Sequence, residues 1–94
     1  MILRTDITTR GVYVRLRDPG RYFDYRPWFQ VPEAIRARVA EVCPRVQVDA
    51  GRLTSGSGWT VSVVFVPHEA LPYGVPEAHQ IAEDVAAIVE GSRV

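Results

Sequence analysis

Residues 45–66, RVQVDAGRLTSGSGWTVSVVFV, contain the most hydrophobic segment of the chain and predict a β-hairpin. The turn is expected at Ser55-Gly56-Ser57-Gly58, with strands near residues 45–53 and 59–66, because small and glycine residues between two β-branched segments favour chain reversal. Ala50-Gly51 interrupts the alternation of the earlier strand, which indicates a β-bulge.

The later strand of this hairpin is expected at the centre of a sheet. Its residues on one face are expected to be Trp59, Val61, Val63 and Phe65. Val64 and Val66 make the other face apolar as well, which is typical of a strand that is covered on both sides.

Two flanking segments begin with the same four residues, VPEA, and each predicts a helix. They are VPEAIRARVAEV from Val31 and VPEAHQIAEDVAAIV from Val75. Proline is tolerated at the first helical position, and a glutamate in the first turn interacts favourably with the helix dipole. Pro44 is expected to end the first helix and Gly91 to cap the second, whose apolar stripe has a period typical of an amphipathic helix.

A second hairpin is expected in residues 10–29, RGVYVRLRDPGRYFDYRPWF, because Asp18-Pro19-Gly20 favours a turn. The register that follows pairs Arg15 with Asp24 and Tyr13 with Arg26. One face of this hairpin would be apolar, through Val12, Val14, Leu16, Phe23 and Tyr25. The opposite face would carry Tyr13, Arg15, Arg17, Tyr22, Asp24 and Arg26.

The predicted fold is a single α+β domain that spans residues 1–94. It has an antiparallel four-stranded sheet made from two hairpins, with both helices on one face, in the order strand, strand, helix, strand, strand, helix. The order of the strands within the sheet stays open. Pro27 cannot donate a hydrogen bond to a neighbouring strand, so residues 22–29 are expected at an edge of the sheet or at a strand end.

Composition indicates a folded, water-soluble chain, since 47% of its residues are apolar and 23% are charged. The longest apolar run, Val63 to Pro67, is far shorter than the roughly 20 residues of a membrane span. Its single cysteine, Cys43, fits a reducing compartment. A cytoplasmic location without a membrane is therefore expected.

The charges are distributed unevenly along the chain. Residues 1–45 hold nine arginines and five acids, for a net charge of +4, while residues 46–94 carry −4. Such an asymmetry is consistent with an anion-binding end or with two complementary ends that associate. The folded protein would not show this charge asymmetry if strands from the two halves of the chain were interleaved in one sheet.

No group of residues has the spacing of a catalytic or cofactor site. His68, Glu69 and His79 lack the spacing of a known zinc motif, and the SGSG turn lacks the lysine of a P-loop. Nothing near Cys43 in the sequence resembles a catalytic base. We therefore expect no enzyme activity, no cofactor and no metal ion.

The expected function is that of a small, non-catalytic, intracellular protein-interaction or regulatory module that forms a homodimer. Its partner-binding residues are predicted to be Tyr13, Arg17, Arg21, Tyr22, Arg26 and Trp28, because tyrosine, tryptophan and arginine are enriched at interfaces. Trp28 has a second interpretation as a core residue between the sheet and the first helix. The alternative function is nucleic-acid binding by the same arginine-rich face, against which Asp24 argues because it would repel phosphate.

Overall fold

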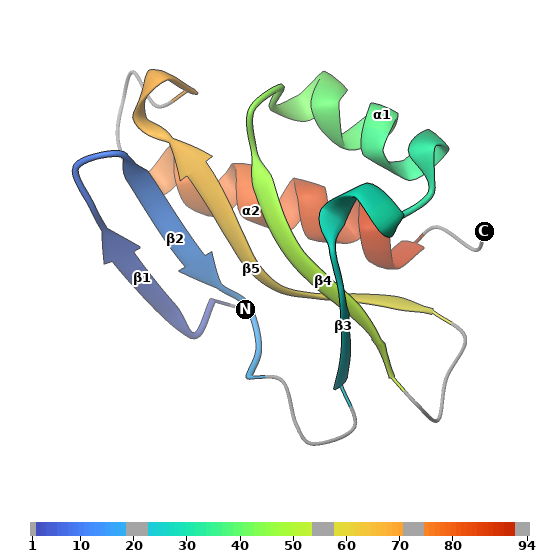
Figure 1. Cartoon of the computed structure of the whole chain (residues 1–94). Helices are drawn as coiled ribbons and strands as arrows, with labels where there is room; N and C mark the ends of the chain where they lie inside the picture. Colours follow the sequence, from blue (N-terminus) through green and yellow to red (C-terminus); the bar gives the residue numbers. More distant parts are fainter. Residues whose placement is uncertain (1, 19–22, 54–57, 71–74, 92–94) are drawn as a thin grey trace.

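The protein is an α+β domain in which two helices cover one face of an antiparallel sheet (Figure 1). The computed structural model describes residues 2–18, 23–53, 58–70 and 75–91. The strands are β1 (Arg4–Ile7), β2 (Gly11–Arg15), β3 (Phe23–Arg26), β4 (Gln47–Leu53) and β5 (Trp59–Pro67). The helices are α1 (Glu33–Val42) and α2 (Val75–Gly91), and short 3-10 turns follow β3 (η1, Trp28–Gln30) and β5 (η2, His68–Ala70).

The sheet has the strand order β1-β2-β5-β4-β3, with every neighbouring pair antiparallel. The α+β class, both helices and the hairpin of β4 and β5 are confirmed, and β3 is an edge strand as expected. The prediction of four strands is wrong, because β1 adds a fifth to the described sheet.

The predicted hairpin of β2 with β3 is also wrong. The β4–β5 hairpin lies between these two strands, so Arg15 does not face Asp24 and Tyr13 does not face Arg26. The physical reason is burial. Val14 lies opposite Val64 of β5, and both are fully buried, whereas Tyr25 of β3 is 52% exposed. Pairing with β5 thus places the valines of β2 in the core.

A tight turn joins β1 to β2 and explains the strand that the sequence analysis missed. Thr8 and Gly11 flank the two connecting residues Thr9 and Arg10. The Thr8 hydroxyl donates to the Gly11 carbonyl at 2.9 Å and accepts hydrogen bonds from the Arg10 and Gly11 amides. Side-chain bonds of this kind stabilise turns without a glycine-proline signal.

The bulge between β4 and β5 changes which face of β5 enters the core. The register shifts between Asp49 and Ala50, where Ser62 of β5 is the extra residue, so the bulge lies beside the predicted position at Ala50-Gly51 but on β5 and not on β4. Trp59 and Val61 are consequently buried with the core, while Val63 and Phe65 are partly exposed. The prediction that these four residues share one face is therefore wrong, although β5 is the central strand as expected.

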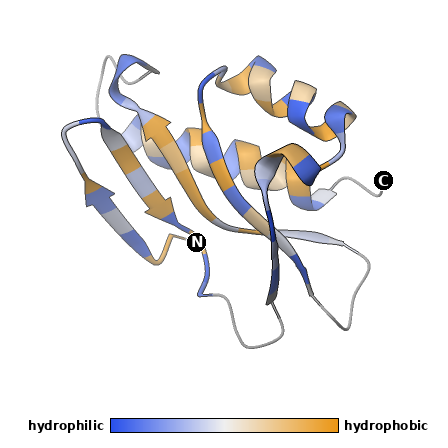
Figure 2. Ribbon diagram, in the orientation of Figure 1, coloured by the Kyte–Doolittle hydropathy of each residue, from blue (hydrophilic) through white to orange (hydrophobic). Residues whose placement is uncertain are grey.

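The core lies between the sheet and the helices. Valines of β2, β4 and β5 supply the sheet side, which gives the alternating apolar and polar bands along β2 and β4 in Figure 2. The helix side consists of Ile35, Val39, Ala78, Ala82, Val85 and Val89, all at most 1% exposed. Among the described residues, no helix is long and apolar enough to cross a membrane.

Candidate interaction surface

The face of the sheet opposite the helices is uncovered in the described structure (Figure 1). Side chains alternate along each strand, so the neighbours of the buried valines point to this side. Cross-strand pairing arranges them in two rows, Asp6-Tyr13-Phe65-Gln47 and Arg4-Arg15-Val63-Asp49. We call these eight residues the outer face.

The centre of the outer face is aromatic and apolar. The Tyr13 ring packs on the Phe65 ring with centroids 4.6 Å apart and an interplanar angle of 44°. Tyr13 is 43% exposed, and Val63 beside them is partly exposed. Solvated faces of antiparallel sheets usually carry polar residues, so an exposed tyrosine packed on a partly exposed phenylalanine of the central strand is unusual.

Charged side chains surround this aromatic centre. Arg4 Nε donates to Asp6 Oδ1 at 3.1 Å, and Arg15 Nη1 lies 3.6 Å from Asp18 Oδ1. Asp49, on the other side of the aromatic pair, has no side-chain hydrogen bond or ion pair within the described part of the chain. On the β1 and β2 side of the outer face, each arginine thus lies beside an aspartate, whereas the β4 side carries the carboxylate of Asp49.

Arg17 turns away from this surface and binds α2. Its Nη2 donates to both carboxylate oxygens of Glu90, at 2.6 and 3.0 Å, and its Nε donates to the Val61 carbonyl at 3.1 Å. Burial raises the pKa of Glu90 above its ordinary value, while the positive charge of Arg17 and the Val61 backbone act in the opposite direction. Arg17 thus links the end of β2 to the C-terminal turn of α2.

The other predicted interface residues lie elsewhere. Arg26, on the edge strand β3, binds Asp24 at 2.7 Å, and it is separated from Tyr13 by β4 and β5. Trp28 is half-buried and packs against the core, whereas its neighbour Phe29 is 72% exposed. Arg21 and Tyr22 lie outside the described residues.

Of the predicted set, then, Tyr13 belongs to the outer face and the described remainder does not. The sequence analysis missed Phe65, Val63 and Asp49 as surface partners of Tyr13. The alternation of side chains along β5 was the signal available for Val63 and Phe65. The bulge, however, places the first residues of β5, Trp59 and Val61, on the face opposite to Val63 and Phe65.

The opposite charges of the two halves of the sequence are brought together. The β4–β5 hairpin, from the acidic half, is inserted between strands of the basic half. Arg17 binds Glu90, and Arg45 Nη1 binds Glu69 Oε1 at 3.0 Å, so cations from the first half bind acids from the second. The sequence asymmetry therefore does not produce separate basic and acidic ends in the fold.

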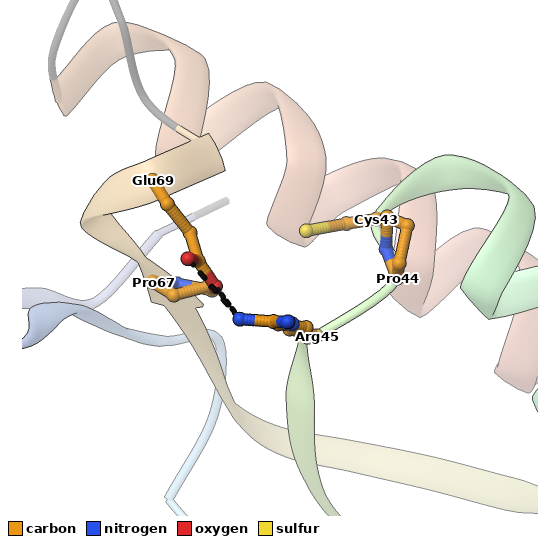
Figure 3. Close-up of a pocket in the computed structure, with 5 residues that line it drawn as sticks. All are labelled: Cys43, Pro44, Arg45, Pro67 and Glu69. Atoms are coloured by element: carbon orange, nitrogen blue, oxygen red, sulfur yellow. Dashed lines mark hydrogen bonds and ion pairs between the residues drawn. The ribbon is translucent and has the colours of Figure 1, made fainter.

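A pocket of about 350 Å³ lies where α1 ends beside β5 (Figure 3). Cys43, Pro44, Arg45, Pro67 and Glu69 line it, and the Arg45–Glu69 ion pair crosses it. Cys43 is 2% exposed, and burial raises the pKa of its thiol, which keeps it protonated and unreactive at neutral pH. The polar groups of this pocket thus bind each other.

The two histidines have structural partners on β1 and on the turn that joins β1 to β2. The Nε2 atom of His79 lies 2.8 Å from Thr5 Oγ1, and the Nε2 atom of His68 contacts the Thr8 carbonyl. Across residues 2–18, 23–53, 58–70 and 75–91, no three His, Cys, Asp or Glu side chains come together in an arrangement able to hold a metal ion.

The outer face is thus the most distinctive surface of the described structure, with an exposed aromatic centre between opposite charges. In comparisons with known proteins, no protein-family model, no curated protein and no solved structure matches the chain.

Proposed function

We propose that this protein is a small, non-catalytic protein-interaction module and that it binds its partner through the outer face. The observation that carries the proposal is the Tyr13–Phe65 ring pair at the centre of an uncovered sheet, in which Tyr13 is exposed and Phe65 is partly exposed. Protein interfaces characteristically have an apolar, aromatic centre within a polar rim, and their binding energy is concentrated in a few central residues. The outer face has this arrangement.

A protein partner fits the charges better than a nucleic acid does. A nucleic-acid site needs several arginines that are available to phosphate. Here the guanidinium groups of Arg17 and Arg26 bind carboxylates, and Asp6 and Asp49 add negative charge to the outer face itself. Such a mixed surface favours a partner that also presents both signs of charge.

The test is affinity capture with two matched variants. Tyr13→Glu places a negative charge in the centre of the outer face, and Phe29→Glu places the same charge on an exposed aromatic outside it. We expect the proteins retained by the unmodified chain, quantified by mass spectrometry, to be lost with Tyr13→Glu and kept with Phe29→Glu. Retention by both variants, or loss with Phe29→Glu alone, would refute the outer face as the binding site.

A further inference from the structure

We propose that the occupant of the outer face is a second copy of this chain, related to the first by a two-fold axis. This inference rests on the proposed function, since it names the partner of the same surface. A two-fold interface uses one patch twice, so the patch must be complementary to itself. The outer face meets this requirement through its two rows of residues.

The axis lies in the plane of the interface, along the strands and between β2 and β5. Rotation about it places β2 of one copy over β5 of the other, and β1 over β4. The strands of the two sheets then run nearly aligned, as in sheet sandwiches, with each row of the outer face over the same row of the second copy. Both sheets have helices on their remote faces, so the dimer has four layers.

The aromatic centre is self-complementary in this arrangement. Tyr13 of each copy meets Phe65 of the other, because these residues are direct cross-strand neighbours in the first row. Four rings therefore come together at the axis, and each Tyr13 loses the 43% exposure that it has in the single chain. Burial of aromatic rings and contact between them both favour association.

The charges are self-complementary as well. In the second row Arg4, at the β1 edge, lies over Asp49 of the other copy, at β4. Asp49 lacks a side-chain partner within the described residues, and the Arg4 side chain is 68% exposed, with its contact to Asp6 made through Nε. The terminal nitrogens of Arg4 are thus placed to bind Asp49, and this contact occurs twice in the dimer.

Charge reversal tests this pairing. Each single variant, Arg4→Glu or Asp49→Arg, brings like charges together at two places, so we expect dimer dissociation constants in sedimentation equilibrium to rise about tenfold or more. The double variant Arg4→Glu/Asp49→Arg restores opposite charges in the reverse sense. It should return the dissociation constant to within about threefold of the unmodified chain, since coupled pairs do not behave additively.

Glu41→Arg is the matched control for Asp49→Arg, because it makes the same charge change at an exposed position of α1. It should leave dimerisation unchanged. Arg4 lies on an exposed edge strand, so Arg4→Gln provides a neutral variant that keeps the fold and should weaken the dimer less than Arg4→Glu.

A monomer at all concentrations tested, or single and double variants that weaken the dimer equally, would overturn the inference. If the unmodified chain is monomeric but captures another protein in a Tyr13-dependent manner, the proposed function stands and only the identity of the partner is wrong. Capture that is independent of Tyr13 would instead refute the proposed function.

Discussion

Arg17 shows how a residue that looks uncommitted in the sequence can have a structural role. The sequence analysis included it among residues available to a partner, but its guanidinium joins β2 to Glu90 of α2 across 73 positions of the chain. Burial disfavours the Glu90 carboxylate, and the two charge-assisted bonds from Arg17 compensate in part. A contact between residues so far apart in sequence cannot be deduced without the strand order.

Removing Arg17 should therefore destabilise the protein more than neutralising its partner. We expect Arg17→Ala to lower the free energy of unfolding by about 1 kcal/mol at pH 7, a modest value because the two side chains are 50% and 24% exposed. Glu90→Gln should cost less, because a neutral amide does not carry the desolvation penalty of the carboxylate. Urea denaturation of both variants measures the difference.

The pH dependence follows from the raised pKa of Glu90. A folded-state pKa above the unfolded value means that the folded protein binds the proton more tightly, so this group adds stability as the pH falls through that interval and removes it as the pH rises. Without Arg17 the pKa of Glu90 rises further. The deficit of Arg17→Ala should thus shrink as the pH falls through the folded-state pKa values of Glu90, which lie above the ordinary glutamate value, and a deficit that grows there would contradict the account.

At the scale of elements, local patterns predicted helices and one hairpin correctly but failed for strand pairing. The VPEA starts and apolar stripes placed α1 and α2 close to their observed bounds, because a helix is specified by neighbours in sequence. The pairing of β2 was decided instead by Val64 and Val66, about 50 residues away. β1 was missed because its residues are mostly exposed and its turn depends on Thr8.

The close approach of β2 to β5 makes a specific prediction at Gly11. A Cβ atom there would collide with the Val66 carbonyl oxygen and lie 2.8 Å from the Phe65 ring, so a strand residue with a side chain would force the two central strands apart. We expect Gly11→Ala to destabilise the protein by about 1–3 kcal/mol, as in overpacked cores. Thermal unfolding measures this effect.

Gly91→Ala is the control for this substitution. Nothing lies within 4 Å of a Cβ atom at Gly91, at the end of α2, so the change should alter stability by less than about 1 kcal/mol. Equal effects at the two glycines would show that β2 and β5 are not in contact as described.

At the scale of the whole molecule, the insertion of the β4–β5 hairpin between β2 and β3 determines both the surface and its charges. It mixes the acidic half with the basic half, and it brings Tyr13 beside Phe65 instead of Arg26. The sequence predicted the fold class and included Tyr13 in its predicted partner-binding set. It could not identify the rest of the outer face, because Phe65, Val63 and Asp49 become neighbours of Tyr13 only through long-range pairing.

This mixing predicts weak binding to nucleic acids. The net charge of the chain is zero, and in the part that the structure describes Arg17 and Arg26 bind carboxylates, which leaves fewer guanidinium groups available to phosphate. We expect no complex tighter than roughly 10 μM with generic single- or double-stranded DNA or RNA at 0.15 M salt. A gel-shift titration that shows tighter, strongly salt-dependent binding would favour the nucleic-acid alternative.

Site-specific photo-crosslinking of the purified chain tests most directly the claim that the outer face joins two copies. A benzophenone amino acid in place of Tyr13 should give a covalent species of twice the monomer mass, with residue 13 attached to a peptide of β5. The same group in place of Phe29, which is more exposed but outside the outer face, should give little of this species. Crosslinked dimers from position 29 and none from position 13 would contradict the account.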